Sequence, residues 1–269
     1  YKGELDGKAI AVKLPIGMAM WNVTEVLDEN IVQSELFCGL RGQWGSGARI
    51  PKIEFMGRLR MPNGYVKIAT GLESLDGDLL ALIRNDMPKM SVEHIDHIFK
   101  HLLMSLCELL ITLQDKYKFT HRDLHGGNLM YKKLGQRDTL GQYRWYIIDF
   151  GMSYIKVNDK EYHTGPIGIY GKWKAPDNNH DLRILFPFIT TFSNIKKRTL
   201  YLDLINTVTK QLYDEYKRLK IRKQSQMWHT SYKAINKKLS TDNMTNPRTL
   251  LDLLKQGDGA VRRWVESHN

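Results

Sequence analysis

The sequence predicts an α+β protein with two lobes: a small β-rich lobe with one helix over residues 1–75, and a larger helical lobe over residues 76–269. Three observations support this fold class. Runs of β-forming residues crowd the first quarter, a 3.6-residue apolar periodicity dominates most of the remainder, and 269 residues that are 42% apolar can bury a large core. Two unequal lobes of this kind predict a cleft between them.

Composition excludes several classes of protein. The chain carries 40 Lys plus Arg against 29 Asp plus Glu, a net charge of +11, and is too apolar to be disordered. No apolar stretch approaches the roughly 18 residues of a membrane span. Cys38 and Cys107 lie in apolar helical patterns, which predicts buried thiols in a reducing, intracellular compartment, either cytoplasm or nucleus.

The first lobe is expected to begin with a hairpin that turns at Asp6-Gly7. A helix, a glycine-bearing loop and two strands separated by Pro62-Asn63-Gly64 complete it. In order, these elements are expected at residues 1–13, 23–40, 41–50, 53–61 and 65–71.

The second lobe is expected to start with a long helix capped by Ser91, whose apolar stripe runs from Ile95 to Leu113. A polar loop, two strands joined by a polar stretch, an irregular glycine-bearing segment and two helices follow. We expect these at residues 120–128, 129–132, 145–149, 151–179, 200–219 and 249–265.

The most specific signal is a pair of motifs, H-R-D-L-H-G-G-N at residues 121–128 and D-F-G at residues 149–151. In this pattern Asp123 accepts the proton of a substrate hydroxyl, while Asn128 and Asp149 hold magnesium on nucleotide phosphates. Magnesium takes oxygen ligands and needs few from the protein. The alternative for either motif alone is a polar turn; both motifs in this order favour ATP and Mg²⁺ as cofactors.

A lysine upstream fits the same chemistry. Lys13 ends an A-V-K strand, where a lysine pairs nucleotide phosphates with a glutamate of the next helix. That helix offers Glu25, Glu29 and Glu35. Glu35 is the first choice because of its strong apolar flank, and Glu29 is the second.

With these motifs in place, the chain resembles the eukaryotic-type protein kinase superfamily, over residues 1 to about 154. Residues 25–36 and 123–128 are similar to haspin-type kinases and to divergent Ser/Thr kinases of large DNA viruses. The resemblance implies that the glycine-rich phosphate loop precedes residue 1, that adenine meets the backbone near Glu73 and Leu75, and that Asp181 braces the catalytic loop. His125 stands where most protein kinases have lysine; it either positions the transferred group or hydrogen-bonds within its own loop.

The chain also departs from that family. Asp123 and Asp149 are 26 residues apart in the sequence. The usual A-P-E motif is replaced by A-P-D at residues 175–177, which lies too close to Asp181 for the usual arrangement of that family. Residues 151–181 are therefore expected to form a short, atypical substrate-docking segment. Its hydroxyls at Ser153, Tyr154, Tyr162 and Thr164 are expected to be exposed, either as plain loop residues or as phosphorylation sites.

The leading hypothesis is a monomeric protein kinase that transfers the γ-phosphoryl group of ATP to Ser or Thr of a protein substrate. The alternatives are a small-molecule phosphotransferase of the aminoglycoside or choline type and a catalytically silent pseudokinase scaffold. Basic clusters in the helical lobe, at residues 196–198, 217–223 and 237–238, suit nucleic acid, chromatin or an acidic protein segment as a partner, or are simply solvated helix faces.

Overall fold

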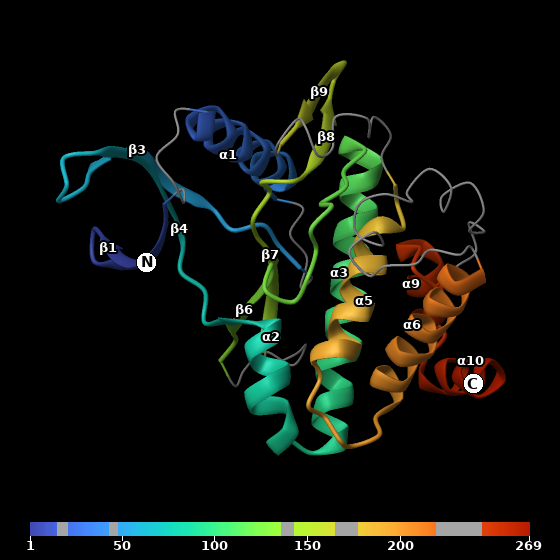
Figure 1. Cartoon of the computed structure of the whole chain (residues 1–269). Helices are drawn as coiled ribbons and strands as arrows, with labels where there is room; N and C mark the ends of the chain where they lie inside the picture. Colours follow the sequence, from blue (N-terminus) through green and yellow to red (C-terminus); the bar gives the residue numbers. More distant parts are fainter. Residues whose placement is uncertain (15–20, 43–47, 136–142, 165–176, 219–243) are drawn as a thin grey trace.

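The computed structural model describes residues 1–14, 21–42, 48–135, 143–164, 177–218 and 244–269. Figure 1 shows the N-terminal strands and helix α1 on one side of the molecule and the helices α3, α5, α6, α9 and α10 on the other. The mixed α+β architecture, β-rich at the N-terminus and helical towards the C-terminus, is confirmed. The lobe boundary at residue 75 stays a prediction.

The N-terminal sheet is antiparallel throughout, with strand order β1-β2-β4-β3. The expected first hairpin is confirmed: Asp6 and Gly7 both have positive φ, 50° and 74°, the geometry of a two-residue turn between twisted strands. The bounds are β1 Lys2–Leu5, β2 Lys8–Lys13, β3 Ile53–Arg60 and β4 Val66–Glu73.

Helix α1, Trp21–Leu40, lies against this sheet. Val32, Leu36 and Leu40 recur at four-residue spacing and are buried, so they define its inner face. The polar Asn30 and Gln33 are buried as well, and each donates a hydrogen bond, to Thr70 Oγ1 and to the Pro51 carbonyl, both at 2.9 Å. The helix therefore has a fixed register on the sheet.

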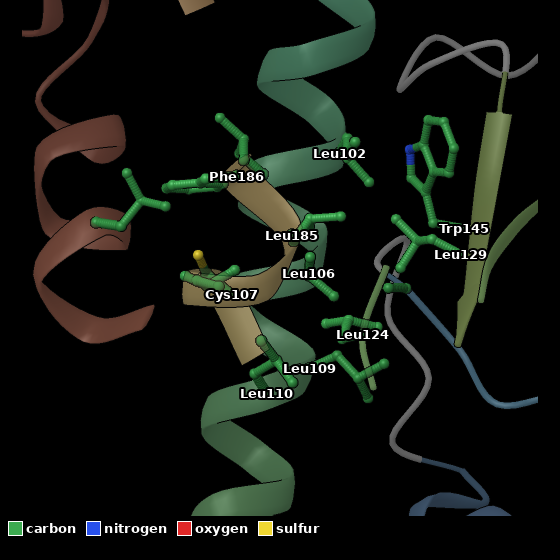
Figure 2. Packing of buried hydrophobic residues seen from close by; sticks show 14 of the residues in the cluster. Leu102, Leu106, Cys107, Leu109, Leu110, Leu124, Leu129, Trp145, Leu185 and Phe186 are labelled. Carbon is green, nitrogen blue, oxygen red and sulfur yellow. The ribbon is translucent and has the colours of Figure 1, made fainter. Parts of the chain in front are cut away.

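Helix α3, Val92–Tyr117, is the centre of the C-terminal core. Its predicted cap is confirmed, because Ser91 Oγ accepts a hydrogen bond from the His94 amide at 3.2 Å. Figure 2 shows leucines of α3 packing with Leu185 and Phe186 of α5, His180–Phe192, and with Leu129 and Trp145 of two strands. Leu124 of the loop that follows α3 belongs to the same cluster, which anchors that loop to the core.

This loop leads into β6 of a second antiparallel sheet, whose strand order is β5-β6-β7. Arg49 pairs with its outer strand: the Arg49 amide donates to the Trp145 carbonyl and the Ile147 amide to the Arg49 carbonyl, both at 2.9 Å. The segment before β3 is thus tied to β7. The bounds are β5 Gly77–Asp78, α2 Leu79–Ala81, a π-helical turn Leu82–Asp86, a 3₁₀ turn Met87–Lys89, β6 Leu129–Lys133 and β7 Tyr143–Ile147.

The structure corrects three expectations. The segment expected to be irregular contains a hairpin, β8 Tyr154–Val157 and β9 Lys160–His163, turning at Asn158, whose φ is 54°. The single helix expected at residues 249–265 is two helices, because Gly257, at φ 91°, breaks it. Cys107 is buried as expected, but Cys38 is exposed, since α1 turns it away from the sheet.

The remaining helices complete the C-terminal half. The expectation of a helix from residue 200 is confirmed as α6, Leu200–Arg218, and the two C-terminal helices are α9, Pro247–Lys255, and α10, Asp258–His268. Among the described residues, no helix has the length and apolar character needed to cross a membrane.

Candidate active site

Three charged side chains from distant parts of the chain meet at one point. Lys13 Nζ, at the end of β2, lies 2.5 Å from Glu29 Oε1 on α1 and 2.9 Å from Asp149 Oδ1, which follows β7. The side chain of Glu29 is only 11% exposed, whereas those of Lys13 and Asp149 are 39% and 45% exposed. The buried carboxylate therefore holds the ammonium group from behind, and Asp149 faces the solvent side.

The charges in this network set its protonation. Burial disfavours the charge on Lys13, but the two carboxylates outweigh it and raise the pKa of Lys13. Burial likewise works against the charge on Asp149, yet Lys13 lowers the pKa of Asp149 below its usual value. Burial raises the pKa of Glu29, and Lys13 opposes that effect. Lys13 and Asp149 are thus charged at neutral pH.

The first choice of helix glutamate, Glu35, is wrong. Glu35 is exposed, and the partner of Lys13 is Glu29, the second choice. Seven residues, nearly two helical turns, separate Glu29 from the buried Leu36, so the two share a face, whereas Glu35 is rotated by about 100° from Leu36. Apolar neighbours in sequence do not specify the face; the position of the buried stripe does.

Glu29 also fixes the D-F-G segment. Its Oε1 accepts a hydrogen bond from the Phe150 amide at 3.2 Å. The Phe150 ring is fully buried, and its centroid lies 5.5 Å from that of His121 and 6.2 Å from that of Phe119. One carboxylate therefore links α1, the lysine and the backbone beside Asp149.

The hydroxyls after this motif are not exposed, contrary to expectation. Ser153, Tyr154 and Thr164 are buried, and Tyr162 is half-buried. Thr164 Oγ1 lies within hydrogen-bonding distance of the carbonyl oxygens of Phe150 and Ser153. The hairpin β8–β9 returns the chain to the D-F-G segment, so the Thr164 hydroxyl holds this segment in place.

Asp181 braces the loop of the first motif, as expected. From the first turn of α5, its two carboxylate oxygens accept hydrogen bonds from the amides of His121 and Arg122, both at 3.0 Å. Complete burial raises the pKa of Asp181 to about 7, against the effect of these two bonds. His180 Nε2 donates to the Arg122 carbonyl at 3.2 Å, and burial lowers the pKa of His180 to about 3, so this ring is neutral.

This bracing supports strained backbone at the site. Arg122 and Asp149 both have positive φ, 69° and 63°, a region that non-glycine residues rarely occupy. His121 connects the two segments, since its Nε2 donates to the Ile148 carbonyl at 2.9 Å; burial lowers the pKa of His121 to about 4. Strain that the surroundings hold in place is typical of functional sites.

Asp123 and Asn128 lie together as their spacing predicts. The Asn128 amide nitrogen donates to the Asp123 carbonyl at 2.9 Å and to Asp123 Oδ2 at 3.3 Å. The Ile148 amide donates to the Asn128 carbonyl at 3.0 Å, which brings Asn128 beside the residue that precedes Asp149. The two motifs are therefore adjacent in space.

His125 hydrogen-bonds within its own loop. Its Nδ1 accepts from the Gly127 amide at 3.0 Å, and its ring stacks on Phe188 with centroids 5.3 Å apart. A neutral ring that accepts at Nδ1 carries its proton on Nε2, and Nε2 lies 3.8 Å from Asp123 Oδ2. A role in positioning the transferred group stays a prediction.

The oxygen ligands present suit magnesium. The Asn128 amide nitrogen is directed at Asp123, which leaves its Oδ1 for a cation, and Asp149 presents a partly exposed carboxylate close by. Among the described residues, no group of three or more His, Cys, Asp or Glu gathers into a site of the zinc type. One carboxylate and one amide match an ion that keeps water and phosphate oxygens as its other ligands.

The expected adenine segment lies at the end of β4. Leu75 is half-buried. The Glu73 carboxylate accepts a hydrogen bond from Tyr146 Oη at 3.2 Å and lies 3.4 Å from Lys132 Nζ. The Glu73 amide donates to the Lys52 carbonyl at 3.0 Å. Adenine binding at Glu73 and Leu75 stays a prediction.

Two further expectations concern the C-terminal half. Of the A-P-D tripeptide only Asp177 is described, and it forms a largely buried ion pair with Arg183 at 3.1 Å. In the basic clusters, Arg198, Lys217 and Arg218 pair with nearby carboxylates of Asp203, Asp214 and Glu215. Residues 219–223 and 237–238 of these clusters lie outside the described residues. Exposed pairs of this kind contribute little to stability, and a role of these clusters in binding a partner stays a prediction.

No protein-family model matches the chain, and no curated protein matches it in sequence. Among solved structures, the chain is similar to one in the crystal structure of the yeast RNA Pol II CTD kinase CTDK-1 complex, with 21% identity and a TM-score of 0.37. That similarity covers 56% of this chain and 41% of the other.

Proposed function

We propose that this protein is a protein kinase that transfers the γ-phosphoryl group of ATP to Ser or Thr hydroxyls of a protein substrate. One observation carries the proposal. Lys13, Glu29 and Asp149 form a single network beside Asp123 and Asn128, although Lys13 and Asp149 are 136 residues apart in the chain. Phosphoryl transfer requires this combination of a phosphate-binding lysine, metal ligands and a carboxylate for the acceptor hydroxyl.

Each residue has a defined task in this reaction. Magnesium, when bound, neutralises charge on the phosphates, and Asp149 and Asn128 are the residues that would hold it. Lys13, held charged by Glu29, binds phosphate oxygens. Asp123, oriented by the Asn128 amide, accepts the hydrogen bond of the acceptor hydroxyl and takes its proton.

The acceptor class rests on fewer features than the transfer itself. Arg122 immediately before Asp123, and the complete D-F-G segment, favour a protein substrate over an aminoglycoside or choline. Retention of all four of Lys13, Asp123, Asn128 and Asp149 in working geometry favours an enzyme over a pseudokinase scaffold. A partner with an acidic segment, bound through the helical lobe, and a cytoplasmic or nuclear location belong to the same proposal.

The test is transfer of label from γ-labelled ATP into mixed protein substrates with Mg²⁺, followed by phosphoamino-acid analysis. We expect label on Ser or Thr, and strongly reduced label with Asp123→Asn; Asp159→Asn, an exposed change on the β8–β9 turn, is the matched control. Label only on tyrosine or only on small aminoalcohols would overturn the acceptor class. No transfer, with Mg²⁺-dependent nucleotide binding intact, would favour the scaffold.

A further inference from the structure

A cavity of about 930 Å³ lies between the two sheets; Glu73 of the expected adenine segment lines it, but the charged network around Lys13 does not. It is bounded by the start of β2, the end of α1, the segment around Arg49, and the ends of β6 and β7. The cavity is not lined by any of the five residues Lys13, Glu29, Asp123, Asn128 and Asp149. Its size is that of a site for a small ligand or a short peptide segment.

The lining is strongly basic. Seven lysine and arginine side chains face three carboxylates. All three carboxylates are already engaged: Glu54 with Lys52 at 2.6 Å, Glu73 with Lys132 and Tyr146, and Asp76 with the Lys133 amide at 2.7 Å. The lining therefore has a surplus of four positive charges that its own acids do not balance.

Arg144 is the centre of this surplus. It shares a face of β7 with Tyr146, whereas Trp145 and Ile147, on the other face, enter the core. Its cross-strand partner on β6 is Lys132, and like charges directly opposite each other destabilise an antiparallel pair. The Arg144 Nε atom is buried with no hydrogen-bond partner among the described residues.

Arg49 adds a second guanidinium group. Its backbone is fixed beside Tyr146 by the two hydrogen bonds to β7, so its side chain starts from a rigid position. Burial, and then the charge of Arg144, lower the pKa of Arg49, while Tyr146 and Glu73 act in the opposite direction; the two guanidinium groups are therefore close enough to interact. Two arginines held together in this way are stabilised by an anion between them.

We propose that this cavity binds a phosphomonoester dianion through Arg144 and Arg49, with Lys8 at its rim. A phosphate monoester carries close to two negative charges at neutral pH, which matches two guanidinium groups, whereas a single carboxylate neutralises only one. Guanidinium groups also bind phosphate oxygens in pairs, through parallel N–H bonds. The ligand is either a phosphorylated segment of a protein or a small phosphate-bearing molecule.

The proposal is tested by calorimetric titration with a short glycine-flanked phosphoserine peptide, its unphosphorylated form, and inorganic phosphate. We expect the phosphopeptide to bind and the unphosphorylated peptide not to bind. Arg144→Gln should weaken binding by about tenfold or more, as expected for loss of a charge-assisted hydrogen bond. Tighter binding of the peptide than of inorganic phosphate identifies a protein segment as the ligand; equal binding identifies a small phosphate compound.

Two controls locate the site. Arg58→Gln removes the same charge from an exposed position on β3, and Lys13→Gln removes a cation from the candidate active site; neither should change the affinity. Equal weakening by Lys13→Gln, or none by Arg144→Gln, would overturn the proposal. No ATP is used, so the result is independent of whether the protein transfers phosphoryl groups.

Stability gives a second readout. Without ligand and at low salt, Arg144→Gln should melt at a higher temperature than the wild type, because it removes the repulsion with Lys132 and Arg49. Added phosphate should stabilise the wild type more than the variant. If Arg144→Gln does not fold, Lys8→Gln, a change at an exposed residue, should weaken phosphopeptide binding instead. Unaltered binding in Lys8→Gln would then count against the site.

Discussion

Lys13 on β2 and Glu29 on α1 form an ion pair, with 2.5 Å between Nζ and Oε1, and the same Glu29 oxygen accepts the Phe150 amide. The pair therefore couples the position of α1 to the backbone next to Asp149. A shift of α1 away from the sheet would release the lysine and the D-F-G segment together.

We expect Glu29→Gln to lower the rate of phosphoryl transfer by roughly tenfold to a hundredfold. A hydrogen bond to a charged group contributes about 1.5–3 kcal/mol, and this one positions the phosphate-binding lysine. Glu35→Gln is the matched control on the same helix, and it should have wild-type kinetics because Glu35 is exposed. A loss in Glu35→Gln with none in Glu29→Gln would make Glu35 the functional partner of the lysine.

Asp149→Asn should abolish the Mg²⁺-dependent part of nucleotide binding. The amide keeps the shape of the side chain but loses the charge that a divalent cation requires. Thermal melting with ATP, in the presence of Mg²⁺ and of a chelator, measures this: the wild type should be stabilised more with Mg²⁺, and the variant equally in both. A full Mg²⁺-dependent shift in the variant would remove Asp149 from the metal site.

Asp123→Asn should lower kcat by on the order of 10²-fold or more and leave the KM for ATP nearly unchanged. Asp123 acts on the acceptor hydroxyl in the transition state and does not contact the nucleotide in the proposed mechanism. Steady-state kinetics at varied ATP separates the two constants. A rise in KM with unchanged kcat would make Asp123 a nucleotide-binding residue instead.

The contribution of His180 to stability should depend on pH. The unfolded chain protonates this histidine below about pH 6.5, whereas burial in the folded protein lowers its pKa to about 3. Its stabilising contribution is therefore complete above pH 6.5 and is lost as the pH falls towards 3. Between pH 6.5 and 5, the loss amounts to about 2 kcal/mol.

Urea unfolding of the wild type and of His180→Gln at pH 7 and pH 5 measures this effect. The difference in free energy of unfolding, wild type minus variant, should be smaller at pH 5. Asp181, with its pKa raised to about 7, works in the opposite direction over the same range, so the difference between the two proteins is the informative quantity. An identical difference at both pH values would show that folding does not lower the pKa of His180.

The local elements can be predicted directly from sequence because short-range chemistry determines them. Asp6-Gly7 specifies its hairpin turn, Ser91 caps α3, and the 3.6-residue stripe defines that helix. The H-R-D and D-F-G motifs identify Asp123, Asn128 and Asp149, since the spacing of five residues between Asp123 and Asn128 confines them to one loop. Asp181 is recognisable through its motif context.

Contacts between distant segments are determined only by the tertiary structure. Which glutamate meets Lys13 depends on the face that α1 presents to the sheet, and the burial of Ser153 and Thr164 depends on where the β8–β9 hairpin docks. Arg49 and Arg144 are separated by 95 positions in sequence and share a cavity only because the segment before β3 pairs with β7. The residue pattern determines turns, caps and apolar stripes, because each of these depends on only a few neighbouring residues. Which surfaces of distant elements meet is determined by long-range packing, because one apolar surface can pack in many orientations.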